Sequence, residues 1–117
     1  MVVDGSWGQD TTKYSQRFFK TTEDGIVSNQ LNKCKKYLPN AYPNSWKFGS
    51  IPHGGSPMIK KLQAYIGAKV DGYFGKDSVK ALQIFLQKLG LYTGAIDGIM
   101  GTGTVKAWQI FINKQFK

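Results

Sequence analysis

The sequence predicts an all-α protein built from repeated units, each made of an Asp-Gly turn followed by a short amphipathic helix. Two observations lead to this prediction. An Asp-Gly pair occurs at four places, and apolar residues with helical spacing follow the pair in three of them. A unit that recurs several times in a short chain indicates an architecture of repeated supersecondary elements.

The clearest unit is DGYFGKDSVKALQIFL, which begins at Asp71. After the turn come an apolar residue, a second glycine and a run whose apolar residues are spaced three and four apart, as on one face of a helix. Asp77 and Ser78 lie where capping residues and first-turn acids are favoured. The unit is therefore predicted to be a tight turn, a buried apolar side chain and a capped helix.

Two further units, DGSWGQDTTKYSQRFF from Asp4 and DGIMGTGTVKAWQIFI from Asp97, keep the same pattern. All three share a glutamine two positions before a phenylalanine. Apolar residues at the matching turn and helix positions are predicted to form the core: Trp7, Phe74, Met100, Phe18, Phe85, Trp108 and Phe111. The copy that begins at Asp24 is degenerate, with Ser28 in place of the glycine and Lys35 in place of the glutamine.

In chain order, we expect a turn and helix in residues 4–19, a second in 24–38, and helices at 58–67, 77–89 and 102–114. Short helices are marginal alone and need their apolar faces buried together. Residues 58–117 are predicted to form a complete three-helix bundle, and residues 1–57 a first, incomplete one in tandem with it. Because the helix before Asp71 has no counterpart before Asp4, we expect the chain to be a piece of a longer protein.

The segment 39–57 differs in composition from the rest, since it holds all four prolines, three large aromatic residues and the only histidine, His53. Flexible linkers are poor in aromatic residues. We therefore interpret residues 39–57 as an ordered arm that packs on the helices, with Trp46 or Tyr42 partly buried. His53 is assigned no role.

The net charge of +9 comes almost wholly from lysine, which favours a diffuse attraction to anionic surfaces over base-specific arginine contacts. No apolar run is long enough to span a membrane, and no stretch is expected to act as a signal peptide. The single cysteine, Cys34, excludes an internal disulfide and is expected to be a buried apolar residue.

The inventory of reactive side chains argues against catalysis. Four of the seven acidic residues open Asp-Gly turns, where a carboxylate accepts a hydrogen bond from the backbone two residues on. Asp10 and Asp77 belong to first helical turns, which leaves only Glu23. One histidine and one cysteine are too few for a zinc site, and the turns lack the ligands of an EF-hand. We predict a chain with no enzymatic activity, no metal and no cofactor.

The motif DGYFG with Ser78, Ala81-Leu82 and Phe85, and the motif DGIMG with its helix, resemble the helical peptidoglycan-binding family. The tandem arrangement resembles the C-terminal wall-binding region of phage endolysins that act on Gram-positive bacteria. The resemblance implies a noncatalytic module that attaches a lytic enzyme to bacterial peptidoglycan. Its partners would be the glycan strand, stem peptide or cross-bridge and a catalytic domain in the parent chain. The implied location is the bacterial cell wall or extracellular face, with release by a phage holin, and neither a membrane nor nucleic acid is implied as a partner.

Ligand contacts are expected among exposed loop aromatics, because the residue before each buried turn residue varies between copies. We predict contacts from Tyr73, Tyr92, Tyr42 and Trp46, with Asn44 and Lys47 as polar partners. Gln83 and Gln109 are further candidates that could bind ligand amides or be satisfied within the helices. Two other functions stay open: a protein–protein docking module of a lysin or phage particle, and a basic nucleic-acid-binding helical domain.

Overall fold

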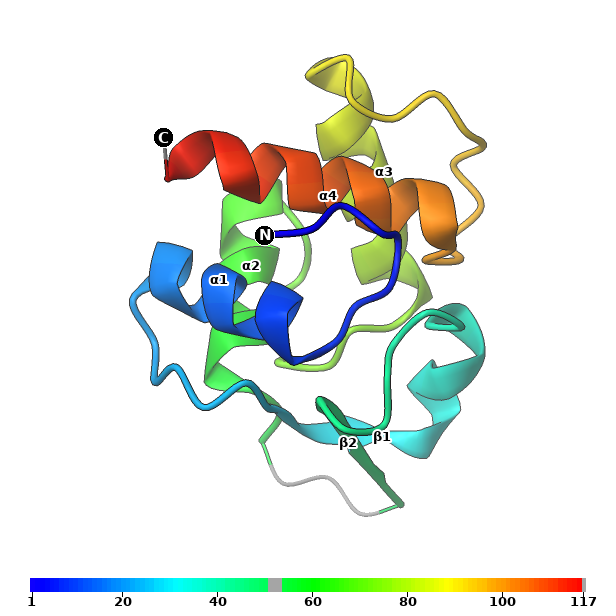
Figure 1. The fold of residues 1–117 in the computed structure, drawn as a ribbon. Helices are drawn as coiled ribbons and strands as arrows, with labels where there is room; N and C mark the ends of the chain where they lie inside the picture. Colours follow the sequence, from blue (N-terminus) through cyan, green and yellow to red (C-terminus); the bar gives the residue numbers. More distant parts are fainter. Residues whose placement is uncertain (51–53, 117) are drawn as a thin grey trace.

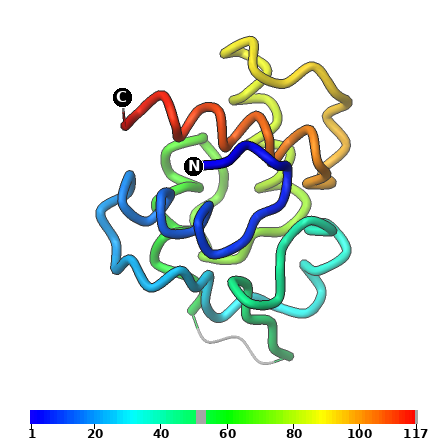
Figure 2. Tube along the Cα trace, in the orientation of Figure 1, coloured from blue at the N-terminus to red at the C-terminus, as the bar shows by residue number. Residues whose placement is uncertain are grey.

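The computed structural model describes residues 1–50 and 54–116 (Figures 1 and 2). His53 lies outside the described residues. Within them the elements follow in the order α1 (Gln9–Phe19), β1 (Val27–Leu31), a 3-10 helix η1 (Asn32–Tyr37), β2 (Trp46–Gly49), α2 (Pro57–Ile66), α3 (Lys76–Lys88) and α4 (Thr102–Gln115). The helices predicted at 58–67, 77–89 and 102–114 are thus present, with ends that differ by one residue.

The four α-helices pack in a closed ring. α1 contacts α2 and α4, and α3 contacts the same two helices, so each helix has two helical neighbours (Figure 1). Local signals define α2 most clearly, because the Ser56 hydroxyl accepts a hydrogen bond from Ile59 N, and Pro57 occupies the first turn. Gly67 ends this helix in a left-handed conformation, with φ of 80°, which glycine adopts without strain.

One hydrophobic core joins the segments 1–57 and 58–117. The indole rings of Trp7 and Trp108 stack with their centroids 6.1 Å apart, and Trp46 meets Trp7 edge-on at 5.5 Å. All three indoles are buried. The two segments that the sequence divides into tandem halves therefore contribute to the same interior.

The strands β1 and β2 correct the prediction of an all-α fold. They pair in parallel, with Val27 opposite Trp46 and Leu31 opposite Gly49, and form a two-stranded sheet at the edge of the helices (Figure 1). The predicted arm is ordered where it is described, because β2 lies in it and Trp46 is only 1% exposed. Its burial is more complete than expected.

The helix predicted over 24–38 is replaced by β1 and η1. The buried residues of this segment, Val27, Gln30, Cys34 and Leu38, are spaced three and four apart, which is why the sequence resembles a helix. Asn29 adopts a left-handed conformation with φ of 55°, which is incompatible with a continuous α-helix. Val27, Gln30 and Leu31 pair with the arm instead. Cys34 is buried as predicted.

Four aromatic residues at matching helix positions meet at one end of the ring of helices. Phe18 contacts Tyr65 (5.4 Å between ring centroids), Tyr65 contacts Phe85 (5.5 Å), Phe85 contacts Phe111 (5.3 Å), and Phe111 contacts Phe18 (5.8 Å). Each pair packs edge to face, which is a favourable geometry for aromatic rings. Phe18 and Phe85 are partly buried members of this cluster and lie at the periphery of the core.

Candidate ligand-binding site

Each Asp-Gly turn is closed by its own aspartate. The carboxylates of Asp4, Asp24, Asp71 and Asp97 accept hydrogen bonds of 2.9–3.0 Å from the backbone N–H two residues on. The glycines that follow have φ between 74° and 82°. At Gly5 a side chain is excluded for a second reason, because a Cβ would lie 2.4 Å from Thr102 Cγ2. The backbone geometry therefore requires glycine in this place.

A buried glutamine from a neighbouring helix forms hydrogen bonds with each turn on the side that faces the protein interior. Gln109 in α4 accepts hydrogen bonds from Asp4 N (3.1 Å) and Gly5 N (3.0 Å), and donates to the Asp4 carboxylate and the Thr11 hydroxyl. Gln83 makes the equivalent contacts with Asp97, Gly98 and Thr104. Both glutamines are at most 1% exposed.

The same arrangement recurs at the other two turns, where Gln16 holds the turn at Asp24 and Gln63 holds the turn at Asp71. Each of the first three helices holds the Asp-Gly turn that follows it along the chain, and the last helix, α4, holds the first turn. Gln83 and Gln109 thus belong to the internal hydrogen-bonding network. This placement supports the alternative that their amide groups are satisfied within the fold, and Gln109 also borders the hollow at Asp4.

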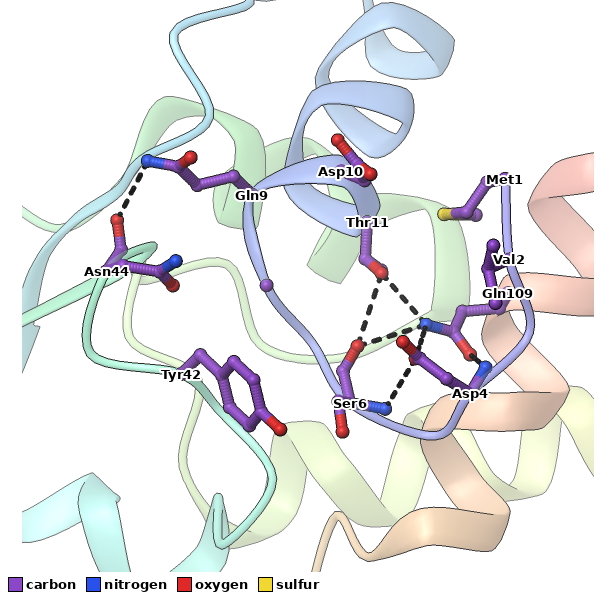
Figure 3. Close-up of a pocket in the computed structure, with 11 residues that line it drawn as sticks. Met1, Val2, Asp4, Ser6, Gln9, Asp10, Thr11, Tyr42, Asn44 and Gln109 are labelled. Atoms are coloured by element: carbon purple, nitrogen blue, oxygen red, sulfur yellow. Dashed lines mark hydrogen bonds between the residues drawn. The ribbon is translucent and has the colours of Figure 1, made fainter.

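A hollow of about 260 Å³ lies beside the turn at Asp4 (Figure 3). The turn and the start of α1 supply most of its lining, including Asp4, Asp10 and Gln9. Tyr42 and Asn44 come from the arm, and Figure 3 shows them across the hollow from Asp4. Tyr42 is 49% exposed, so part of its ring is accessible to a ligand. The structure therefore brings the predicted contacts Tyr42 and Asn44 together with Gln109.

A second hollow, of about 410 Å³, lies beside the turn at Asp71. Every residue that lines it has its repeat counterpart in the lining of the Asp4 hollow: Lys69, Asp71, Tyr73, Gly75, Lys76, Asp77 and Ser78 correspond to Val2, Asp4, Ser6, Gly8, Gln9, Asp10 and Thr11. Tyr73 is half-buried in this second hollow, and its hydroxyl accepts a hydrogen bond from Gly54 N. The two hollows are thus copies of one architectural feature.

At the Asp97 turn, the side chain of Tyr92 occupies the space that corresponds to the hollows at Asp4 and Asp71. Its hydroxyl donates to the carbonyl oxygen of Ala95 at 2.6 Å and lies 3.3 Å from Gln83 Nε2. Gly103 stands where the units at Asp4 and Asp71 have Asp10 and Asp77, and a Cβ there would lie 3.6 Å from Tyr92 Cε1. Tyr92 is only 9% exposed. It therefore fills this third position, which corrects its assignment as an exposed ligand contact.

The turn at Asp24 also borders a hollow, but a different element forms the opposite wall. Ser56, Pro57 and Met58 at the start of α2 line it together with Asp24 and Ser28. The degenerate copy has no α-helix of its own to provide that wall, because η1 and the strands replace it. This hollow is consequently not equivalent to those at Asp4 and Asp71.

The remaining predicted contacts lie apart from these hollows. Trp46 is buried in the core and presents no ring face to a ligand, which corrects its assignment as a contact. Lys47 is exposed, and its ammonium group donates to the carbonyl oxygen of Pro43. Sequence reasoning treated Asp10 and Asp77 as purely structural, yet both line the hollows. Their matching positions in the repeats were the signal that could have identified them.

Each hollow has a pair of aspartates in its lining, which in the Asp71 hollow are accompanied by Lys69 and Lys76. Asp4 and Asp10 line the first, and Asp71 and Asp77 line the second. The pKa of Asp4 lies below its ordinary value, because Ser6 N–H and then the Gln109 amide donate hydrogen bonds to its carboxylate. Carboxylates accept hydrogen bonds, so these hollows favour ligand groups that donate them.

Three findings concern metal ligands, the cysteine and membrane-spanning helices in the described part of the chain. No group of three or more His, Cys, Asp or Glu side chains in residues 1–50 and 54–116 could hold a metal ion. Burial raises the pKa of the Cys34 thiol, which disfavours the thiolate needed for nucleophilic attack. Among the helices described, none is long and apolar enough to cross a membrane.

Residues 76–109 match the model of a protein family described as "Putative peptidoglycan binding domain". The matched segment runs from the first residue of α3, through the turn at Asp97, to Gln109 in α4. The match confirms the resemblance to peptidoglycan-binding repeats for this part of the chain. Comparisons with curated proteins and with solved structures gave no match.

Proposed function

We propose that this chain is a noncatalytic module that binds bacterial peptidoglycan and attaches a lytic enzyme to the cell wall. The observation that carries the proposal is the family match over residues 76–109. The matched segment contains a complete unit of glutamine, Asp-Gly turn and helix, and the same unit recurs around the ring. The proposal extends the match from one unit to the repeated architecture.

Two properties of the surface support attachment to a wall polymer. The excess of lysine gives a net charge of +9, which attracts the chain to a polyanionic envelope. The hollows at Asp4 and Asp71 each combine a tyrosine ring with several polar groups, which offer a ligand a flat aromatic face together with hydrogen-bond partners. The partners are then the glycan strand, stem peptide or cross-bridge of peptidoglycan, and a catalytic domain in the parent chain. The corresponding location is the cell wall, reached by phage-holin release if the parent is an endolysin.

The test is sedimentation with purified Gram-positive sacculi, carried out across walls of several cross-bridge chemistries. We expect the chain to move into the pellet while the turbidity of the suspension and the amounts of reducing ends and free amines stay constant. Clearing of the suspension would show catalysis and contradict the noncatalytic assignment. Retention in the supernatant with every wall would contradict wall binding and favour the docking alternative.

Salt dependence separates wall binding from nucleic-acid binding. Binding to nucleic acid through many lysines falls steeply as salt rises, because counterions are released from the phosphates. Binding to the wall through hydrogen bonds and aromatic contacts should persist at moderate salt. Tighter binding to oligonucleotides than to sacculi at physiological salt would overturn the proposal.

A further inference from the structure

Resting on the proposed function, we infer that the hollows at Asp4 and Asp71 are two copies of one saccharide-binding site for the glycan strand, and that Tyr92 closes the third copy. The hollows at Asp4 and Asp71 are equivalent in the repeat. Every residue that lines the Asp71 hollow has a counterpart in the Asp4 hollow, so a ligand group that fits one meets the same backbone and the same pair of carboxylates in the other.

Tyr92 indicates the kind of group that fits. In the Asp97 copy its side chain places a flat ring and a hydroxyl against the turn, and the hydroxyl donates to the carbonyl oxygen of Ala95. The counterparts of Ala95 are Val2 and Lys69, which line the two open hollows. The closed copy is thus occupied by a group of the chain itself whose hydroxyl has a main-chain acceptor.

The two open copies carry a carboxylate at the position where the closed copy has glycine. Asp10 and Asp77 occupy the position of Gly103, and no hydrogen bond within residues 1–50 and 54–116 involves either carboxylate. A saccharide presents several hydroxyl donors together with an apolar ring face. The hydroxyls match the carboxylates and main-chain carbonyls, and the ring face matches Tyr42 in the first hollow or Tyr73 in the second.

A neutral ligand suits both hollows, although their charges differ. Asp4 and Asp10 line the first hollow without a lysine, whereas Lys69 and Lys76 balance Asp71 and Asp77 in the second. Uncharged hydroxyl groups can donate to the carboxylates in either hollow, whereas a charged group of the stem peptide would meet a different net charge in each. Two such sites on one chain also suit a polymer of repeating sugars, since the second contact forms at a high effective concentration.

The experiment measures binding of peptide-free oligosaccharides, cut from purified walls, to the full chain by isothermal titration calorimetry. We expect two equivalents per chain for the unchanged protein. Asp10→Asn and Asp77→Asn should each leave one equivalent at full affinity and weaken the other by about tenfold, because each removes a charged hydrogen-bond acceptor. The double variant should weaken both. Glu23→Gln is the matched control, since it makes the same change of charge at an exposed residue away from these two hollows.

A gain of binding provides the second test. The double variant Tyr92→Ala, Gly103→Asp removes the tyrosine and restores the aspartate of the open copies, so it should bind a third equivalent. If this variant fails to fold, the two Asn variants still decide the proposal. Unchanged binding in both Asn variants would overturn it.

The sacculi assay separates this inference from the proposed function. If the unchanged chain sediments with intact sacculi but does not bind peptide-free oligosaccharides, the saccharide inference fails while peptidoglycan binding stands. If intact sacculi are not bound at all, the proposed function itself fails.

Discussion

Gln109 Nε2 lies 3.0 Å from a carboxylate oxygen of Asp4, so the last helix of the chain holds the first turn. The same glutamine also accepts hydrogen bonds from the backbone at Asp4 and Gly5. Because Gln109 is buried, these groups have no alternative partners in solvent on that side. The contact therefore closes the ring of helices through a network that depends on one side chain.

Replacing Gln109 with leucine should lower the free energy of unfolding by about 2–4 kcal/mol, because it leaves buried backbone N–H groups without acceptors. Urea denaturation followed by circular dichroism measures the change. Gln87→Leu is the matched control, since Gln87 is exposed on α3, and it should change the free energy by less than about 0.5 kcal/mol. Equal effects of the two substitutions would show that the buried network is not important for stability.

Acid should destabilise the fold through the turn aspartates. Hydrogen bonds from Ser6 N–H and Gln109 to Asp4, and from Ile99 N–H and Gln83 to Asp97, lower both pKa values below the ordinary 3.8. The unfolded chain therefore binds protons at a higher pH than the folded chain does. The resulting stabilisation is complete above the unfolded pKa and is lost as the pH falls through the folded pKa.

The test is the urea midpoint measured between about pH 6 and pH 2. The double variant Asp4→Asn, Asp97→Asn keeps an oxygen acceptor at each turn and removes both titrations. Its midpoint should decline less steeply below pH 3.8 than that of the unchanged chain. Identical slopes would assign the acid sensitivity to other carboxylates.

Tyr42→Ala should weaken binding to sacculi by about three- to tenfold, because the ring forms the exposed wall of the Asp4 hollow. Tyr65→Ala is a suitable control, since Tyr65 is 47% exposed compared with 49% for Tyr42 and lies in the aromatic cluster. Sedimentation at several protein concentrations measures both variants. A greater loss for Tyr65→Ala would place the wall-binding surface on the aromatic cluster.

Trp46→Ala should lower the free energy of unfolding by about 3–5 kcal/mol, because it removes a fully buried indole that packs against Trp7 and Phe74. Trp46→Phe should cost less than half as much. It keeps a ring in the core and removes an indole N–H that has no hydrogen-bond partner within the described residues. Chemical denaturation measures both, and a negligible cost for the alanine variant would contradict a core role for the arm.

The helices of the repeats could be predicted from sequence because local signals and burial agree there. In α3 the apolar spacing, the first-turn acid Asp77 and the buried Val79 all indicate the same element. The segment 24–38 has helical spacing as well, but its conformation is decided by pairing with β2, which lies in a distant part of the sequence. A periodic pattern does not report such a nonlocal partner.

The candidate site was predicted in part. Tyr42 and Asn44 were selected as exposed residues of the arm, and the structure places both in the Asp4 hollow. Trp46, from the same arm, points into the core, because β2 begins at this residue and pairs it with Val27, which is buried. The glutamines were recognised as a shared feature, but only their contacts with the turns show what they do.

The position of the chain ends has a consequence for how the polypeptide could be rewired. Asn113 Nδ2 donates to the carbonyl oxygen of Met1 at 2.9 Å, so the first residue lies beside the last turns of α4. A short glycine-serine linker could join the two ends, and new ends could be opened between the exposed residues Thr22 and Glu23. Such a circular permutant should form the same four-helix ring, because the closing contact between α4 and the first turn would then lie within a continuous stretch of chain. The units could therefore follow one another in a different order along the sequence and still occupy the same places in the fold.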